Sequence, residues 1–252
     1  MKNKLSRRGK KIFMTKIPEI SIIIPAYNAG SELEACLDSL MNLDFPQDER
    51  EIIVVNNNST DKTEEIIKKY PVKYAFEGKR GANAARNKGI KISTGKIIAF
   101  LDHDCVARRS WLKNLIKPFG DPNIACCGGE YYPYNPKTLI ERCIASSFCR
   151  QAFGLAGHGP FFPFVNTRNA AFRRGVLEDI GLFDEFFMAC QDMEISRRLC
   201  MKGHKIGYVP DAVVLHKYPD RITTYLRKKF AWGLSESYLR EKYKDSIKAV
   251  LI

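Results

Sequence analysis

The residues best suited to chemistry in this sequence are two acids, Asp102 and Asp104, which directly follow the apolar run 96–101. A buried strand over that run would deliver both carboxylates to the carboxyl edge of a sheet, where open α/β sheets bind ligands. Two hard oxygen donors at such an edge are typical ligands of Mg²⁺ or Mn²⁺. The alternative is a simple turn, because aspartate is common after strands.

The elements expected to position these acids alternate between strands and helices from residue 19 onward. Apolar runs predict strands over 21–24, 52–55, 72–76 and 96–101. Ser31 with Glu34, and Asp61 with Glu64, form capping-box patterns that predict two helix starts, and a third helix is expected over 82–93. Repeated β-α-β units indicate a mainly parallel α/β sheet flanked by helices.

The regular alternation of predicted strands and helices ends after residue 118. Helices are predicted over 174–180 and 192–202, a strand over 212–215, and a helical tail over 225–252. The segment 154–163 is rich in glycine, proline and aromatic residues. It is expected to form either a lid-like loop or an aromatic core connection.

Positive charge is concentrated at the two ends of the chain. The net charge is +13, of which residues 1–16 carry seven Lys/Arg and no acids, and residues 215–252 carry nine Lys/Arg against four acids. Such basic ends fit an anionic membrane surface or an acidic partner, although a solvated tail explains 1–16 equally well. The near-neutral middle argues against a nucleic-acid partner.

Six segments, one of which contains Asp102 and Asp104, occur in an order that is typical of one enzyme family. They are residues 24–28, 54–61, 81–89, 100–104, 169–174 with 181–185, and 191–199. Together they resemble the inverting family 2 glycosyltransferases of the GT-A fold, over about residues 19–217. The resemblance implies a Rossmann-like, nucleotide-binding sheet that abuts a smaller acceptor-binding region.

The resemblance also implies a division of the chain and an activity. Residues 1–18 are expected to be a basic extension, 19–120 the nucleotide-sugar-binding half, 121–217 the acceptor-binding and catalytic half of the same domain, and 218–252 a basic amphipathic helical tail. The expected reaction transfers one sugar from a nucleotide-diphosphate donor, preferably a UDP-sugar, to a hydroxyl of a glycan or lipid-linked saccharide. The chain lacks the Gln-x-x-Arg-Trp motif of processive synthases, which favours single addition.

The resemblance assigns a cofactor and a base. Asp104, assisted by Asp102, matches the family's metal anchor, and His216 matches its late metal-ligand histidine, so Mn²⁺ or Mg²⁺ is expected. A divalent cation would stabilise the charge left on the departing diphosphate. Asp192 matches the catalytic aspartate, and a helix start there should help to keep it ionised. The alternative is that Asp192 only caps that helix.

The nucleotide is expected to lie against the first two strand ends and the helix over 82–93. The family often has acids where this chain has Asn56 and Asn57. Their amides can accept from uracil or donate to another base, which leaves GDP and dTDP open. Arginine suits phosphate through its forked donors. The expected nucleotide-binding residues are Pro25, Ala26, Tyr27, Asn28, Asn56, Asn57, Arg80, Arg86 and Asp102.

Three residues are predicted to contact the acceptor: Gln191, His158 and Trp232. Gln191 stands where the family usually has glutamate before the catalytic aspartate. Trp232 lies in the basic-aromatic segment 227–233, which could stack on a sugar or bind lipid headgroups. The predicted partners are therefore a nucleotide sugar and a glycan or lipid-linked acceptor.

The expected location is the cytoplasm, with peripheral contact at the inner face of the membrane. No secretory signal or membrane span is visible, and eight cysteines without metal-site spacing are typical of reduced thiols. Two other functions stay open. One is a catalytically weakened GT-A protein that binds nucleotide sugar, and the other is a nucleotidyltransferase, which would want a glycine-rich phosphate loop after the first strand.

Overall fold

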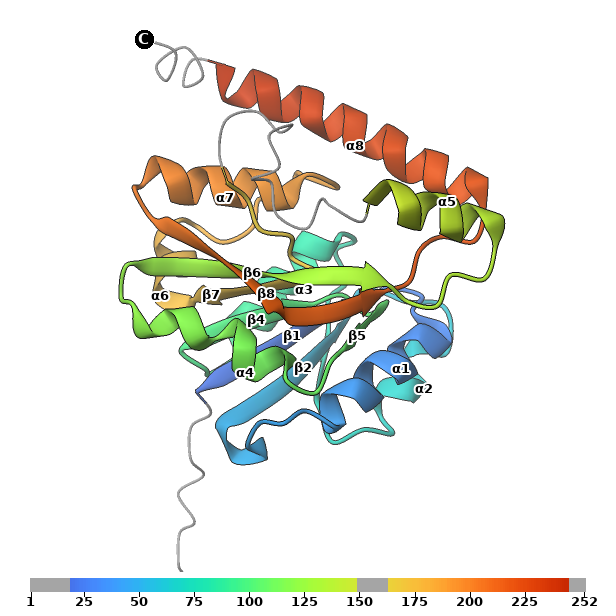
Figure 1. Ribbon diagram of the computed structural model, residues 1–252, viewed down its shortest axis with the longest axis horizontal. Helices are drawn as coiled ribbons and strands as arrows, with labels where there is room; N and C mark the ends of the chain where they lie inside the picture. The colour runs from blue at the N-terminus through green and yellow to red at the C-terminus, as the bar shows by residue number, and fades with distance from the viewer. Residues whose placement is uncertain (1–18, 149–162, 245–252) are drawn as a thin grey trace, which may run out of the picture.

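The computed structural model describes residues 19–148 and 163–244, which form one mixed eight-stranded sheet with helices on both faces (Figure 1). The strand order is β3-β2-β1-β4-β7-β6-β8-β5. The strands are β1 (Ile20–Ala26), β2 (Arg50–Asn56), β3 (Lys73–Phe76), β4 (Ile97–Leu101), β5 (Cys105–Ala107), β6 (Ile124–Pro133), β7 (Asn169–Arg173) and β8 (Lys205–His216). The helices are α1 (Gly30–Met41), α2 (Thr63–Ile67), α3 (Ala82–Ile92), α4 (Trp111–Leu115), α5 (Leu139–Phe148), α6 (Arg174–Asp179), α7 (Gln191–Met201) and α8 (Ile222–Lys242), with short 3-10 turns at Gln47–Glu49 and Lys117–Gly120.

The predicted parallel sheet is confirmed in the first half of the chain. Strands β3, β2, β1 and β4 are all parallel to one another. The second half is mixed: β7 is antiparallel to both β4 and β6, and β5 is antiparallel to β8, whereas β6 and β8 are parallel. Because β4 and β7 are adjacent, both halves of the chain share one sheet. The predicted division at residue 120 stays a prediction.

The two faces of β4 contribute to two separate cores, as the alternation of its residues predicts. Ala99 and Leu101 pack with α1, α2 and α4 on one face. Ile98 and Phe100 pack with α3, α6 and α7 on the other. Since every side chain of the last four residues is buried, the strand is fixed in register up to the turn that carries the two acids.

The predicted capping box at Ser31 and Glu34 is wrong, because α1 begins at Gly30 without a side-chain cap from its own residues. The neighbouring loop supplies the acceptor instead: Asp61 Oδ2 accepts from the Gly30 N–H at 3.1 Å. Asp61 also accepts from the backbone of Thr63 at 3.0 Å, where α2 begins. One acid therefore orders two helix starts, and α2 is only one turn long.

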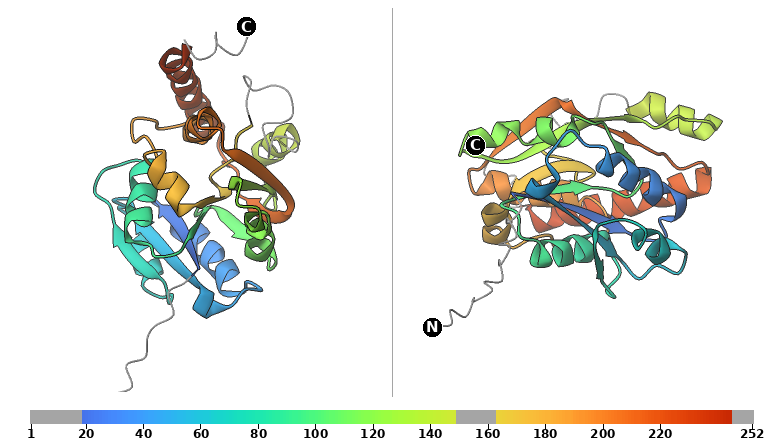
Figure 2. Two further views of the ribbon diagram at one scale, coloured as in Figure 1. Left: turned by 90° about the vertical axis from the view of Figure 1, so that its left-hand side faces the viewer. Right: turned by 90° about the horizontal axis from the view of Figure 1, so that it is seen from below.

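The C-terminal helix α8 lies along the outside of the molecule, beyond α5 and α7 (Figures 1 and 2). It ends at Lys242, and residues 245–252 of the predicted helical tail lie outside the described residues. Within the described ranges, none of the helices combines the length and apolar composition that crossing a membrane requires.

Candidate active site

The two acids that follow β4 line a cavity of about 370 Å³. Asp102 and Asp104 lie on one wall, on the short turn between β4 and β5. Asp192, near the start of α7, and His216, the last residue of β8, also line the cavity. The sheet and α7 therefore bring the expected metal ligands and the expected base into one cavity, although Asp104 and Asp192 are 88 residues apart in the sequence.

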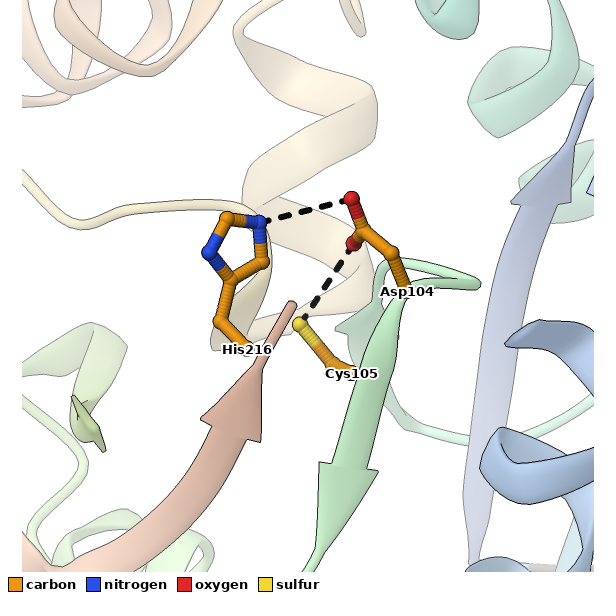
Figure 3. A group of neighbouring side chains, drawn as sticks. All are labelled: Asp104, Cys105 and His216. Atoms are coloured by element: carbon orange, nitrogen blue, oxygen red, sulfur yellow. Dashed lines mark hydrogen bonds and ion pairs between the residues drawn. The ribbon is translucent and has the colours of Figure 1, made fainter. Parts of the chain in front are cut away.

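Asp104 and His216 form the centre of a candidate metal site (Figure 3). Pairing of β5 with β8 places Cys105 opposite His216 and so brings the preceding acid to the histidine. Asp104 Oδ2 lies 3.4 Å from His216 Nε2, and Cys105 Sγ lies 3.7 Å from Asp104 Oδ1. Burial raises the pKa of the Cys105 thiol, which keeps it protonated and a poor ligand. The oxygen and nitrogen donors that remain fit Mn²⁺ or Mg²⁺.

Arg168 is a neighbour of this metal site that the sequence analysis missed. Its guanidinium Nη1 lies 3.1 Å from His216 Nδ1 and its Cζ lies 4.8 Å from the centre of the Tyr131 ring. Burial, and then the charge of Arg168, lower the pKa of His216. These two effects favour the neutral imidazole, which is the form that binds metal. Arg168 lies in a loop and belongs to no recognisable motif, so the sequence alone could not predict its contact with His216.

Asp102 differs from Asp104 in its partner. Arg86, on α3, donates from Nη2 to Asp102 Oδ1 at 2.8 Å. The guanidinium is buried, and its Nε has no hydrogen-bond partner among the residues that the structure describes. Because a buried arginine needs a compensating charge, this pair fixes Asp102 at the cavity wall. The prediction that Arg86 reaches base or phosphate remains untested.

Asp192 is held at the cavity by Thr167. Its Oδ1 accepts from the Thr167 backbone N–H at 3.1 Å and from the hydroxyl at 2.6 Å. The helix N-cap is Cys190, and Asp192 makes no capping hydrogen bond there, which disfavours the capping alternative. Burial raises the pKa of Asp192, against the opposing charge of Arg86. This direction is opposite to the one expected from a helix start, and it moves the carboxyl toward the pKa of a useful general base.

Two of the three expected acceptor residues line the same cavity. Gln191 and Trp232 both face it, the latter from α8 together with Lys228. Gln191 Oε1 is buried and has no hydrogen-bond partner within 19–148 and 163–244. An orphaned acceptor beside the candidate base is suited to a ligand hydroxyl or amide. His158 lies outside the described residues.

The two asparagines expected at the nucleotide have structural partners in this fold. Asn57 donates to the carbonyls of Glu77 and Lys79 at 3.1 and 2.7 Å, and its Oδ1 accepts from the Gly81 N–H at 2.8 Å. Asn56 Oδ1 accepts from the backbone of the loop that follows β2. Asn57 therefore fixes the loop that leads into α3. A contact with the base stays a prediction for both residues.

Four of the remaining expected nucleotide residues lie at the carboxyl end of β1, and Arg80 lies in the loop before α3. None of the five is among the residues that line the cavity. Pro25 and Ala26 are buried, so any ligand contact there would involve the backbone. Tyr27 is exposed, hydrogen-bonded to Arg80, and covered by its guanidinium at 4.7 Å from the ring centre. Asn28 has a φ of 46° and accepts from the backbone of the loop 58–61. The Tyr27–Arg80 pair offers a flat cationic surface that suits a base and its phosphates.

The segment that leads to Asp192 is held by α3. Asn83 donates to the carbonyls of Asp184 and Phe187 at 2.8 and 3.0 Å. One turn later, Asn87 donates to Phe183 O at 2.9 Å and accepts from the Phe183 N–H at 3.0 Å. The helix that contributes Arg86 therefore also positions the loop before the candidate base.

The mixed sheet and this cavity are typical of the GT-A fold, and the comparisons show the family. The chain belongs to glycosyl transferase family 2, whose family model matches residues 21–181. It is 28% identical over 244 residues to the probable glycosyltransferase YdaM of Bacillus subtilis, covering 91% of this chain and 58% of YdaM. It is 29% identical over 227 residues to the glycosyltransferase AglE of Haloferax volcanii, covering 86% of this chain and 72% of AglE.

A solved structure with the same fold is the mannosyltransferase PcManGT of Pyrobaculum calidifontis, in complex with GDP-Man and Mn²⁺. The TM-score is 0.67 at 26% identity, over 84% of this chain and 61% of PcManGT. The chain thus spans about three-fifths of the length of YdaM and of PcManGT.

Proposed function

We propose that this chain is a metal-dependent, inverting glycosyltransferase that moves a single sugar from a nucleotide-diphosphate donor to a hydroxyl acceptor. The observation that carries the proposal is the shared cavity, whose lining includes Asp104, His216 and the Thr167-bound Asp192. A metal site and a general base in one cavity are the two requirements of this reaction.

The metal would be held by Asp104 and His216, with Asp102 beside them. When bound, Mn²⁺ or Mg²⁺ would neutralise the charge that develops on the diphosphate. The proton transfer and the orientation of the acceptor would depend on protein side chains. Asp192 takes the proton of the acceptor hydroxyl as its oxygen bonds to the anomeric carbon, and the sugar–phosphate bond breaks on the opposite face. That geometry inverts the anomeric configuration, and Thr167 keeps the Asp192 carboxylate oriented toward the acceptor.

For the donor, the sequence favours a UDP-sugar, and the GDP-Man bound to PcManGT makes a GDP-sugar the main alternative. The proposed acceptor is a glycan or a lipid-linked saccharide. The cavity wall from α8 includes the aromatic rings of Tyr225 and Trp232, which supports a sugar-stacking site.

The direct test is to incubate the chain with UDP-, GDP- and dTDP-sugars in the presence of Mn²⁺ and to detect the released nucleoside diphosphate. Asp192→Asn should abolish turnover and leave donor binding intact, whereas Asp104→Asn should weaken both. Asp121→Asn, on an exposed acid outside the cavity, is the matched control. Binding without turnover in the unaltered chain would support the weakened-enzyme alternative, and release of pyrophosphate from a nucleoside triphosphate would support a nucleotidyltransferase.

A further inference from the structure

Helix α8 carries a row of exposed apolar side chains at intervals of four residues. Their exposed fractions lie between 49% and 71%, with Phe230 the most exposed. Residues four apart lie on one side of a helix, so the row forms a continuous strip. We call it the outer stripe; it consists of Ile222, Leu226, Phe230 and Leu234.

The opposite side of α8 is already occupied by the protein. Tyr225, Lys228 and Trp232 line the cavity, and Leu239 is buried. The helix therefore has an inner face, which closes the candidate active site, and an outer face, whose apolar side chains point to solvent. A surface helix of a soluble domain ordinarily buries its only apolar face, so a second apolar face indicates a binding surface.

The charged residues between positions 221 and 235 are all positive. They are Arg221 and Arg227, together with Lys228 and Lys229, which also reach the cavity. All four cations are exposed. An apolar strip flanked by Lys and Arg is the pattern of a helix that lies in the interface of an anionic membrane, where the cations meet lipid phosphates. A protein partner would not require this uniform sign of charge over residues 221–235.

We propose that α8 docks in the plane of an anionic lipid bilayer through the outer stripe. Phe230 and its neighbours enter the boundary between headgroups and acyl chains, and Arg221 and Arg227 contact the lipid phosphates. Since the inner face of the same helix lines the cavity, docking brings the candidate active site to the membrane surface. This last consequence rests on the proposed function, because it would give a lipid-linked acceptor a short path to Asp192.

The test is co-sedimentation of the full chain with vesicles of phosphatidylcholine alone or mixed with phosphatidylglycerol, without nucleotide sugar. The chain should bind the anionic vesicles, and binding should weaken with salt. Phe230→Glu should reduce binding at least tenfold, because it replaces buried apolar area with a charge. Arg227→Gln should reduce it about fivefold on anionic vesicles only.

The matched control is Phe76→Glu, which makes the same change at a residue that is 51% exposed on β3, the strand at the other edge of the sheet from β5. Its vesicle binding should equal that of the unaltered chain. Equal binding by Phe230→Glu, or no binding of the unaltered chain to either vesicle, would overturn the proposal. A dimer in solution that Phe230→Glu dissociates, with no vesicle binding, would assign the surface to a second copy of the chain. Donor hydrolysis in solution tests the proposed function separately and should be unchanged in Phe230→Glu.

Discussion

At the scale of single residues, the protonation state of the candidate base depends on a competition between burial, which favours the neutral carboxyl, and two groups that favour the carboxylate. Burial raises the pKa of Asp192, while Arg86 and the Thr167 hydrogen bonds favour its ionised form. The base works only when ionised, and its ionised fraction falls as the pH drops through its pKa. The acid limb of the kcat/KM profile should therefore lie above the ordinary range of an aspartate.

Replacing Thr167 by valine removes the 2.6 Å hydroxyl donor and keeps the shape of the side chain. Because the lost bond stabilised the ionised carboxylate, the pKa of Asp192 should rise and the acid limb should move to higher pH. We also expect kcat to fall about tenfold as the carboxylate loses its orientation. The measurement is kcat/KM against pH. Thr94→Val, which loses an exposed bond to Glu51, should leave the profile in place, and an acid limb that moves downward would contradict the assignment.

At the scale of elements, Asn169 connects the second half of the sheet. Its amide donates to the carbonyls of Glu130 and Ala212 at 2.7 Å each, and its oxygen accepts from the Trp111 indole N–H at 2.7 Å. Asn169 and Trp111 are fully buried. One side chain therefore joins α4, β6, β7 and β8.

Asn169→Ala should lower the free energy of unfolding by about 3 kcal/mol or more, because it leaves three buried polar groups without partners. Urea denaturation followed by circular dichroism would measure this change. Asn123→Ala removes an exposed asparagine bound only to Asp121 and should stay within about 0.5 kcal/mol. A loss below about 1 kcal/mol at position 169 would show that water replaces the missing amide.

A close approach of β6 to β8 requires glycine at position 129. A Cβ on Gly129 would lie 2.2 Å from the carbonyl oxygen of Ala212, at the point where the register of the two strands shifts. Gly129→Ala should therefore destabilise the fold by at least about 2 kcal/mol. Gly175→Ala, in α6 with open space around its Cβ, should instead raise the free energy of unfolding by up to about 1 kcal/mol. Equal denaturation midpoints for the two variants would refute this account.

At the scale of the whole molecule, ligand binding should be visible as stability, because the metal site joins the end of β8 to the turn after β4. A nucleoside diphosphate with Mn²⁺ at about 100 times its Kd should add about 2.7 kcal/mol and raise the Tm by roughly 5–10 °C. Differential scanning fluorimetry would measure the shift. It should disappear with EDTA or in Asp104→Asn and persist in Asp121→Asn. A Tm shift of the same size with and without Mn²⁺ would contradict the proposed metal dependence.

The sequence by itself determined the local features of this protein. Alternating apolar residues in 97–101 specified a strand buried on both faces, and the acids after it had to lie at the carboxyl edge of a parallel sheet. The order of the short motifs was sufficient to identify the family. These predictions succeeded because they depend on neighbours in the chain and on burial patterns that each segment carries within itself.

Only the tertiary structure decided which side chains meet. The pairing of Arg168 with His216 joins residues 48 apart in the chain, and the contact of Thr167 with Asp192 joins residues 25 apart. The loop after β2 replaced the expected cap of α1, and the amide of Asn57 bonded to backbone groups. The physical reason is the same in each case: a polar group takes the partner that folding brings within about 3 Å, and that partner is set by the packing of distant elements rather than by local sequence.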